Sequence, residues 1–220
     1  MTRLTLFAAG LGLAATLASG CDREAEPLLC GELAAGDLVI TEVRGGPTVV
    51  DADGQWIELY NASGAPVELH GLALTIDSIS GGDHDRVLLR RAFSVAPGAY
   101  AVLGKFDDAQ RPGHVDVGWG TEPVIPRDGA ITIACGSDID RIAFTSLPDP
   151  RQHEDTNPPS QAPPAGSGTY ALGLMPPDAA GNDGPAAWCA DATETLGPCT
   201  GSTCLEYYKG SPGEQNPACP

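Results

Sequence analysis

Two short acidic loops contain the residues best suited to bind a metal ion. DADG at 51–54 places two carboxylates two residues apart before a glycine, and GGDHDR at 81–86 supplies two more. Calcium prefers carboxylate oxygens in loops of this kind. The EF-hand continuation is missing, since the twelfth position counted from Asp51 is Ala62 and not a bidentate Glu. An Asp/Gly turn and a solvated loop are the competing interpretations. The candidate calcium ligands are Asp51, Asp53, Asp83 and Asp85.

Glu42 in TEV and Glu58 in WIEL form a second candidate pair. They lie close together if the two strands that carry them are neighbours, and paired carboxylates can do acid–base work. In a β-sandwich such residues more often hydrogen-bond the backbone of loops. We therefore expect a structural role for both.

The sequence contains no recognisable enzyme motif. The four histidines lack HExxH spacing, no serine lies in a G-x-S-x-G elbow, and GSG at 166–168 lacks the Lys and helix of a phosphate loop. We therefore expect that the protein is not an enzyme. The competing hypothesis is a metal-dependent hydrolase that uses Asp83, His84 and Asp85, or else the acidic pair.

The seven cysteines suggest an oxidising compartment. Apart from Cys21 they are even in number, which predicts three disulfides, although the sequence leaves their connectivity open. The spacing does not favour zinc. The pairings that we consider most natural are Cys30 with Cys135, Cys189 with Cys219, and Cys199 with Cys204.

The elements that would position these residues are short β-strands. From 37 to 145, alternating or apolar β-formers are separated by Gly, Pro, Asp and Asn, and no helical period is sustained. Seven such segments predict an all-β fold, a β-sandwich of immunoglobulin-like size. In QWIELYN we expect Ile57 and Leu59 to face the core. The expected strands are 37–43, 55–61, 66–76, 86–93, 99–104, 129–135 and 138–145.

The chain changes character beyond this region. Residues 147–168 are rich in Pro and polar residues, which predicts a long loop. Residues 169–220 hold four cysteines and little regular pattern, so we expect an irregular, disulfide-rich tail that completes the domain of residues 37–146.

Residues 1–20 have the layout of a secretory signal peptide: Arg3, an apolar run, then small residues before Cys21. This junction resembles the lipobox of bacterial lipoproteins, in which the cysteine is lipidated. The usual lipobox has Leu three residues before the cysteine, where this chain has Ala18. The resemblance implies a lipid anchor at Cys21 and a tether over 21–36. The alternative is an ordinary secreted protein in which Cys21 stays free or pairs with another thiol.

The net charge of −17 argues against nucleic acid as a partner. Binding to phosphates depends on Lys and Arg releasing counterions, and a surface this acidic repels the same phosphates.

Several segments together resemble the lamin-tail domain: DLVITEV, WIELYN at 56–61 followed by VEL-x-G at 67–71, FSVAPGAYAVLG, and the closing GSPGEQN at 210–216. The resemblance covers about residues 36–216 and implies an immunoglobulin-like β-sandwich found in nuclear lamins and in exported bacterial proteins. It implies fold more than chemistry.

We therefore expect a lipoprotein of the bacterial cell envelope, held in the inner or the outer membrane through Cys21, that carries a lamin-tail-like binding or structural module. Its expected partners are the membrane and an unidentified protein or cell-surface ligand. A calcium-stabilised adhesion module is the main alternative.

Overall fold

The computed structural model describes residues 30–45, 55–79, 84–126, 128–145, 169–191, 193 and 210–219. These residues form an all-β fold, as the sequence predicts, and the only helical element among them is the short 3-10 helix η2 (Pro185–Ala187). Within the described part of the chain, no helix is long and apolar enough to cross a membrane. The strands are β1 (Leu38–Arg44), β2 (Trp56–Asn61), β3 (Val67–Glu68), β4 (Ala73–Ser78), β5 (His84–Leu88), β6 (Ser94–Val95), β7 (Tyr100–Gly104), β8 (Val117–Gly118), β9 (Gly129–Cys135), β10 (Ser137–Phe144), β11 (Thr169–Leu172) and β12 (Trp188–Ala190).

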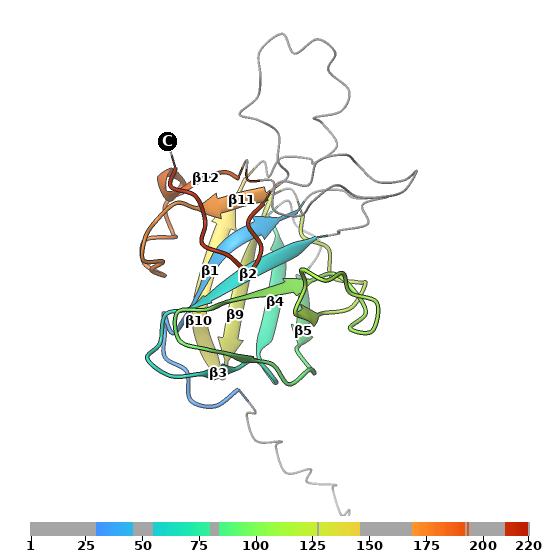
Figure 1. The fold of residues 1–220 in the computed structure, drawn as a ribbon. Helices are drawn as coiled ribbons and strands as arrows, with labels where there is room; N and C mark the ends of the chain where they lie inside the picture. The colour runs from blue at the N-terminus through green and yellow to red at the C-terminus, as the bar shows by residue number, and fades with distance from the viewer. Residues whose placement is uncertain are drawn as a thin grey trace, which may run out of the picture.

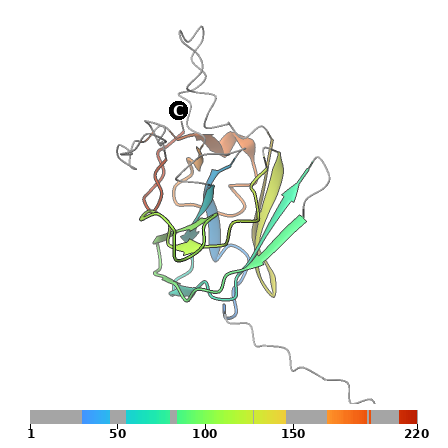
Figure 2. The same cartoon turned by 90° about the vertical axis from the view of Figure 1, so that its right-hand side faces the viewer.

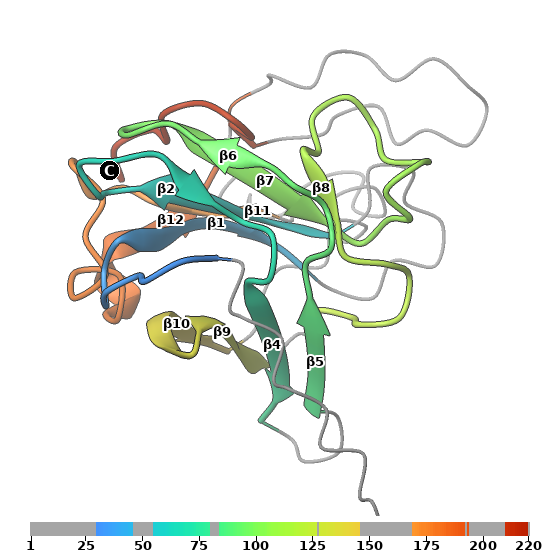
Figure 3. The ribbon, with the colours of Figure 1, turned by 90° about the horizontal axis from the view of Figure 1, so that it is seen from below.

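Two sheets form the two layers of the molecule. The larger sheet has the strand order β12-β11-β1-β2-β7-β8, and the smaller has the order β10-β9-β4-β5. Figure 3 shows them as separate layers, with β1, β2 and β7 in one and β9, β10 and β4 in the other. Strands β3 and β6 form a small third sheet. In Figure 2 the β4–β5 hairpin lies at the outer margin of the smaller sheet.

The core between the layers follows from strand alternation. Ile57 and Leu59 face inward, as predicted, and both are fully buried together with Ile40 of β1 and with Leu74 and Ile131 of the smaller sheet. Side chains of successive residues in a strand point to opposite faces. Trp56 and Glu58 therefore face away from this core, yet they too are fully buried. A further layer must cover the outer face of the larger sheet.

The predicted strand at 66–76 is wrong in extent, because the structure divides it into β3 and β4. A turn closed by the Leu72 N–H and the Leu69 carbonyl separates them, with Gly71 at a φ of 88°. Glycine tolerates this φ because it has no Cβ. The turn leads the chain from the two-stranded sheet of β3 and β6 into the four-stranded sheet that contains β4. Strand β5 also ends earlier than predicted, at Leu88.

The expectation of an irregular tail is corrected for residues 169–172 and 188–190. Strand β11 pairs with β1 through Glu42 opposite Ala171, and β12 pairs with β11. Ala171 and Leu172 are fully buried. The tail thus adds two strands to the larger sheet and does not depend on disulfides alone.

A polar junction joins the two sheets where β10 meets β1. The Asp140 Oδ2 atom accepts hydrogen bonds from the Ile40 N–H at 2.7 Å and from the Asn182 side chain at 2.7 Å. The same Asn182 amide donates to the Ile40 carbonyl. Burial raises the pKa of Asp140, while these bonds and one from the Arg141 N–H favour the ionised form.

Candidate functional site

Glu42 and Glu58 lie directly opposite each other on β1 and β2. The proximity that the sequence suggested for this pair is therefore confirmed. Both side chains are fully buried on the outer face of the larger sheet. Asp191, which follows β12, is fully buried as well, and its carboxyl group lies near enough to Glu42 to raise the pKa of that side chain. We call Glu42, Glu58 and Asp191 the acidic cluster.

Residues 210–216, which we call the clasp, cover the acidic cluster. In Figure 1 this segment, in red, crosses β1 and β2, and in Figure 3 it lies on the side of the larger sheet away from the smaller one. The Ser211 N–H donates to Glu42 Oε1 at 3.1 Å, and the Gly213 N–H donates to Glu58 Oε2 at 2.7 Å. Both glutamates thus bind loop backbone, which is the structural role that we expected.

Side chains of the clasp continue this network. The Ser211 Oγ atom lies 2.6 Å from Asp191 Oδ2 and 3.0 Å from Asn216 Oδ1. The Asn216 Nδ2 atom donates to the Thr41 carbonyl at 2.7 Å, which fixes the orientation of the amide. The Thr41 hydroxyl in turn donates to Glu58 Oε1 at 2.8 Å.

The electrostatic environment of the cluster opposes ionisation. Burial is the main cause that raises the pKa of Glu42, and Glu58 and Asp191 raise it further. Burial also raises the pKa of Glu58, from its ordinary value of 4.5 to about 8, although hydrogen bonds from Thr41 and Gly213 oppose the shift. A carboxyl group taken out of water beside other carboxylates favours its neutral form. The two glutamates therefore favour the protonated form near neutral pH.

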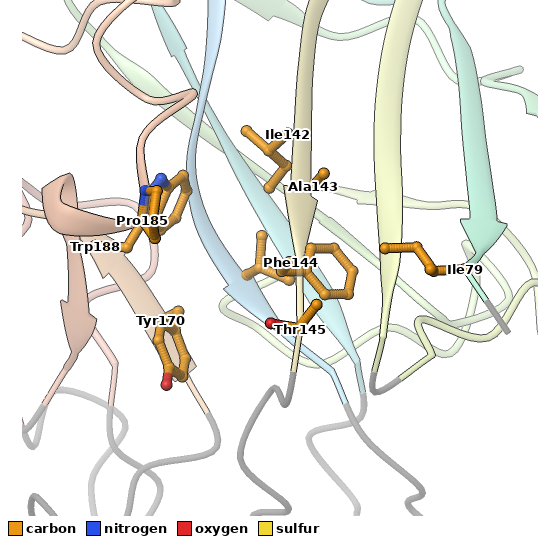
Figure 4. Close-up of a pocket in the computed structure, with 9 residues that line it drawn as sticks. Ile79, Ile142, Ala143, Phe144, Thr145, Tyr170, Pro185 and Trp188 are labelled. Atoms are coloured by element: carbon orange, nitrogen blue, oxygen red, sulfur yellow. The ribbon is translucent and has the colours of Figure 1, made fainter.

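A pocket of about 260 Å³ opens between the edges of the two sheets (Figure 4). Tyr170, Pro185 and Trp188 lie on one side of it, and Ile142 and Phe144 of β10 face them. The Trp188 Nε1 atom donates to the Asn182 carbonyl at 2.7 Å, which holds the indole ring in place. Aromatic and aliphatic walls of this kind suit an apolar group. The full lining is Val43, Ile79, Ile142, Ala143, Phe144, Thr145, Tyr170, Pro185 and Trp188.

We call this cavity the end pocket. It lies at the opposite end of the smaller sheet from the Cys30–Cys135 disulfide. Phe144 pairs with Gly129 at the start of β9, whereas Cys135 ends that strand. Six residues of a strand separate the two ends by about 20 Å. In Figure 1 the first described residues, in blue, enter at the lower end, and β1 and β10 finish at the upper end.

The candidate calcium ligands are only partly described. Asp51, Asp53 and Asp83 lie outside the described residues. Asp85 lies exposed on β5, and the neighbouring His84 ring contacts the Asp77 carboxyl group. Among the residues that the structure describes, no three His, Cys, Asp or Glu side chains converge on a point where a metal ion would fit.

Two disulfides stabilise the described part of the chain. They join Cys30 to Cys135 and Cys189 to Cys219, which are two of the pairings considered from sequence. The second bond fixes Cys219, three residues beyond the clasp, to β12. Cys21, Cys199 and Cys204 lie outside the described residues.

Sequence reasoning missed Asp191 and Asn182, which complete the acidic cluster and the sheet junction. Neither residue belongs to a motif, and each meets partners from distant parts of the chain: Asp191 contacts Ser211, and Asn182 contacts Asp140. GSPGEQN was the one usable signal, because it contains both Ser211 and Asn216.

The sequence matches no protein-family model and no curated protein.

Proposed function

We propose that this chain is a lipid-anchored protein of the bacterial cell envelope whose lamin-tail-like, immunoglobulin-like β-sandwich serves as a binding module, not as an enzyme. The lipid on Cys21 is the anchor, and the end pocket is the binding surface. The observation that carries the proposal is the position of the Cys30–Cys135 disulfide relative to that pocket.

The disulfide supports a short, strong connection to the membrane. Cys30 is nine residues after Cys21, so covalent geometry limits the span between them to about 30 Å. Because Cys30 is bonded to β9, the tether ends on the core of the domain and not on a terminus that can peel away. The end pocket lies at the opposite end of that strand and so faces away from the anchor.

The arrangement of acidic groups favours binding over catalysis. Glu42 and Glu58 are covered by the clasp, and neither lines the end pocket. A general acid or base must reach its substrate. The pocket offers apolar side chains and the hydroxyl groups of Thr145 and Tyr170, which suit binding.

The anchor is tested with Cys21→Ala. We expect the wild-type protein to incorporate labelled palmitate and to sediment with membranes, and the variant to do neither. A variant that stays in the membrane fraction would refute the lipid anchor.

The binding surface is tested by placing a photo-crosslinking residue at Thr145, which lines the end pocket. Asp138 is the matched control, since it is exposed near the start of β10, whereas Thr145 directly follows the end of that strand. We expect a specific crosslinked product in intact envelopes from position 145 and none from position 138. Equal products from both positions, or none from either, would contradict binding at the end pocket.

A further inference from the structure

Buried acceptor atoms around Ser211 outnumber the hydrogens that their neighbours can donate to them. The Ser211 Oγ atom lies in hydrogen-bonding range of two acceptors, Asp191 Oδ2 and Asn216 Oδ1. A hydroxyl group has one hydrogen to donate. The Asn216 amide cannot be reversed to supply another, because its Nδ2 atom donates to the Thr41 carbonyl. One hydrogen therefore cannot serve both acceptors, and the nearer of the two is Asp191 Oδ2.

Glu42 holds a buried acceptor that is left without a hydrogen. Its Oε1 atom accepts the Ser211 N–H, while its Oε2 atom is buried and receives no hydrogen bond from any donor among the described residues. Its neighbour is the carboxyl group of Asp191, another acceptor. Two carboxyl groups form a hydrogen bond with each other only when one of them is protonated, and burial, which raises the pKa of Glu42, places that proton on Glu42.

We propose that Glu42 and Asp191 hold a shared proton that keeps the clasp closed on the larger sheet, and that loss of this proton to solvent base opens the clasp. The clasp is thus a pH-sensitive latch. In the closed state the protonated pair bonds to Ser211 through both its backbone N–H and its hydroxyl group.

The charges around the pair explain why deprotonation opens the latch. A second negative charge would arise between Glu42 and Asp191, beside Glu58, where burial prevents water from screening the repulsion. Burial raises the pKa of Tyr100 to about 12, so this side chain stays neutral over the relevant range. The charged and titratable groups on the elements packed around Glu42 are Arg44, Glu58, Tyr100, Asp116, Asp191 and Glu214.

The Cys189–Cys219 disulfide makes the opening local. It fixes the chain three residues beyond Asn216, so the clasp can leave the sheet without releasing the C-terminal segment from β12. Gly210 packs close to Trp56, since a Cβ at Gly210 would lie 3.2 Å from the indole ring. Opening therefore uncovers Trp56, Glu42 and Glu58 on the outer face of the larger sheet.

Hydrogen exchange at the Ser211 and Gly213 amides tests the latch in the full-length protein. After correction for intrinsic exchange, we expect their protection to fall about tenfold or more between about pH 6 and about pH 9, while amides of β1 and β2 keep theirs. Constant protection of both clasp amides over this range would overturn the proposal.

Glu42→Gln is the decisive variant. Its side-chain carbonyl can still accept the Ser211 N–H, and its NH₂ group supplies at every pH the hydrogen that the shared proton supplies in the wild type. We expect the clasp of this variant to stay protected at alkaline pH. The exposed Glu122→Gln is the matched control and should open like the wild type. Loss of protection in Glu42→Gln equal to that in the wild type would refute the shared proton.

A second measurement does not require a variant. Carbon-13 spectra of the wild-type carboxyl groups should show that Glu42 retains its proton above neutral pH and loses it over the range in which the clasp amides lose protection. If Glu42 lost its proton in the ordinary acidic range, the latch would have no proton to lose and the proposal would fail.

Discussion

The carboxyl group of Asp140 joins the two sheets through buried hydrogen bonds. It accepts hydrogen bonds from the N–H groups of Ile40 and Arg141 and from the Asn182 amide. Asp140→Ala would leave the buried Ile40 N–H and one hydrogen of the buried Asn182 amide unpaired, and each unpaired donor costs about 1–3 kcal/mol. We expect the free energy of unfolding to fall by roughly 3 kcal/mol or more in urea denaturation.

The matched control for this prediction is Asp138→Ala. Asp138 is exposed on the same strand, so its loss should change the free energy of unfolding by less than about 0.5 kcal/mol. Similar losses in the two variants would show that the bonds of Asp140 do not hold the sheets together.

Gly210 is the residue at which the clasp approaches the sheet most closely. Its φ of 153° disfavours other residues, and an added Cβ would lie 3.2 Å from Trp56 and 3.3 Å from Glu42 Oε1. We expect Gly210→Ala to lift the clasp and to lower the melting temperature. Gly184→Ala, where nothing lies within 4 Å, should have little effect. Equal melting temperatures for both variants would contradict close packing at Gly210.

Most strands were predictable from sequence because their side chains alternate. Ile57 and Leu59 show the pattern, and β1, β2, β7, β9 and β10 begin and end within one residue of their expected limits. Strands β11 and β12 were missed because they are short and gain their stability from pairing with β1 and with each other. The split at Gly71 was missed because the apolar pattern runs through the turn.

Only half of the candidate site could be predicted from the sequence. Glu42 and Glu58 could be paired, because each lies in a recognisable strand and the two strands are joined by one connection. Asp191 and the clasp lie about 150 residues further along the chain, and no local pattern indicates that they fold onto the same face. Buried hydrogen bonds of this kind depend on tertiary structure, which a single sequence does not reveal.

The two described disulfides close loops of different length, which predicts different losses on removal. The Cys30–Cys135 bond spans 105 residues and the Cys189–Cys219 bond spans 30. By loop-closure entropy, replacing each pair with Ser should cost roughly 5 and roughly 4 kcal/mol, respectively.

Thermal unfolding of the two double-Ser variants measures these losses. Hydrogen exchange distinguishes them further, since only the Cys189 and Cys219 variant should also expose the clasp amides. A clasp that keeps its full protection in that variant would show that the disulfide does not hold this segment in place.

At the scale of the whole molecule, the end pocket and the Cys30–Cys135 disulfide lie at opposite ends of the smaller sheet in a two-layer fold. The acidic cluster and the clasp lie on the outer face of the larger sheet. Because the three regions share few residues, substitutions at one should leave the others intact. The proposals for the anchor, the end pocket and the latch can therefore succeed or fail independently.

The pH dependence of overall stability follows from the acidic cluster. The pKa of Glu58 rises from 4.5 to about 8 on folding. Between these values only the folded state holds the proton, so the free energy of unfolding should fall as pH rises and level off above about pH 8. Chemical denaturation at pH 5.5 and 8 should show a loss of at least about 1 kcal/mol.

High salt and a substitution of Glu58 distinguish this pH-dependent loss of stability from a second possible cause. That cause is the surface repulsion expected of a chain with a net charge of −17. Salt screens surface charges but acts weakly on buried ones, so the pH-dependent loss should persist at high ionic strength. Glu58→Gln cannot ionise and should reduce the loss. The exposed Glu122→Gln should retain it in full. If high salt abolished the loss in the wild type, surface repulsion and not the buried cluster would be its cause.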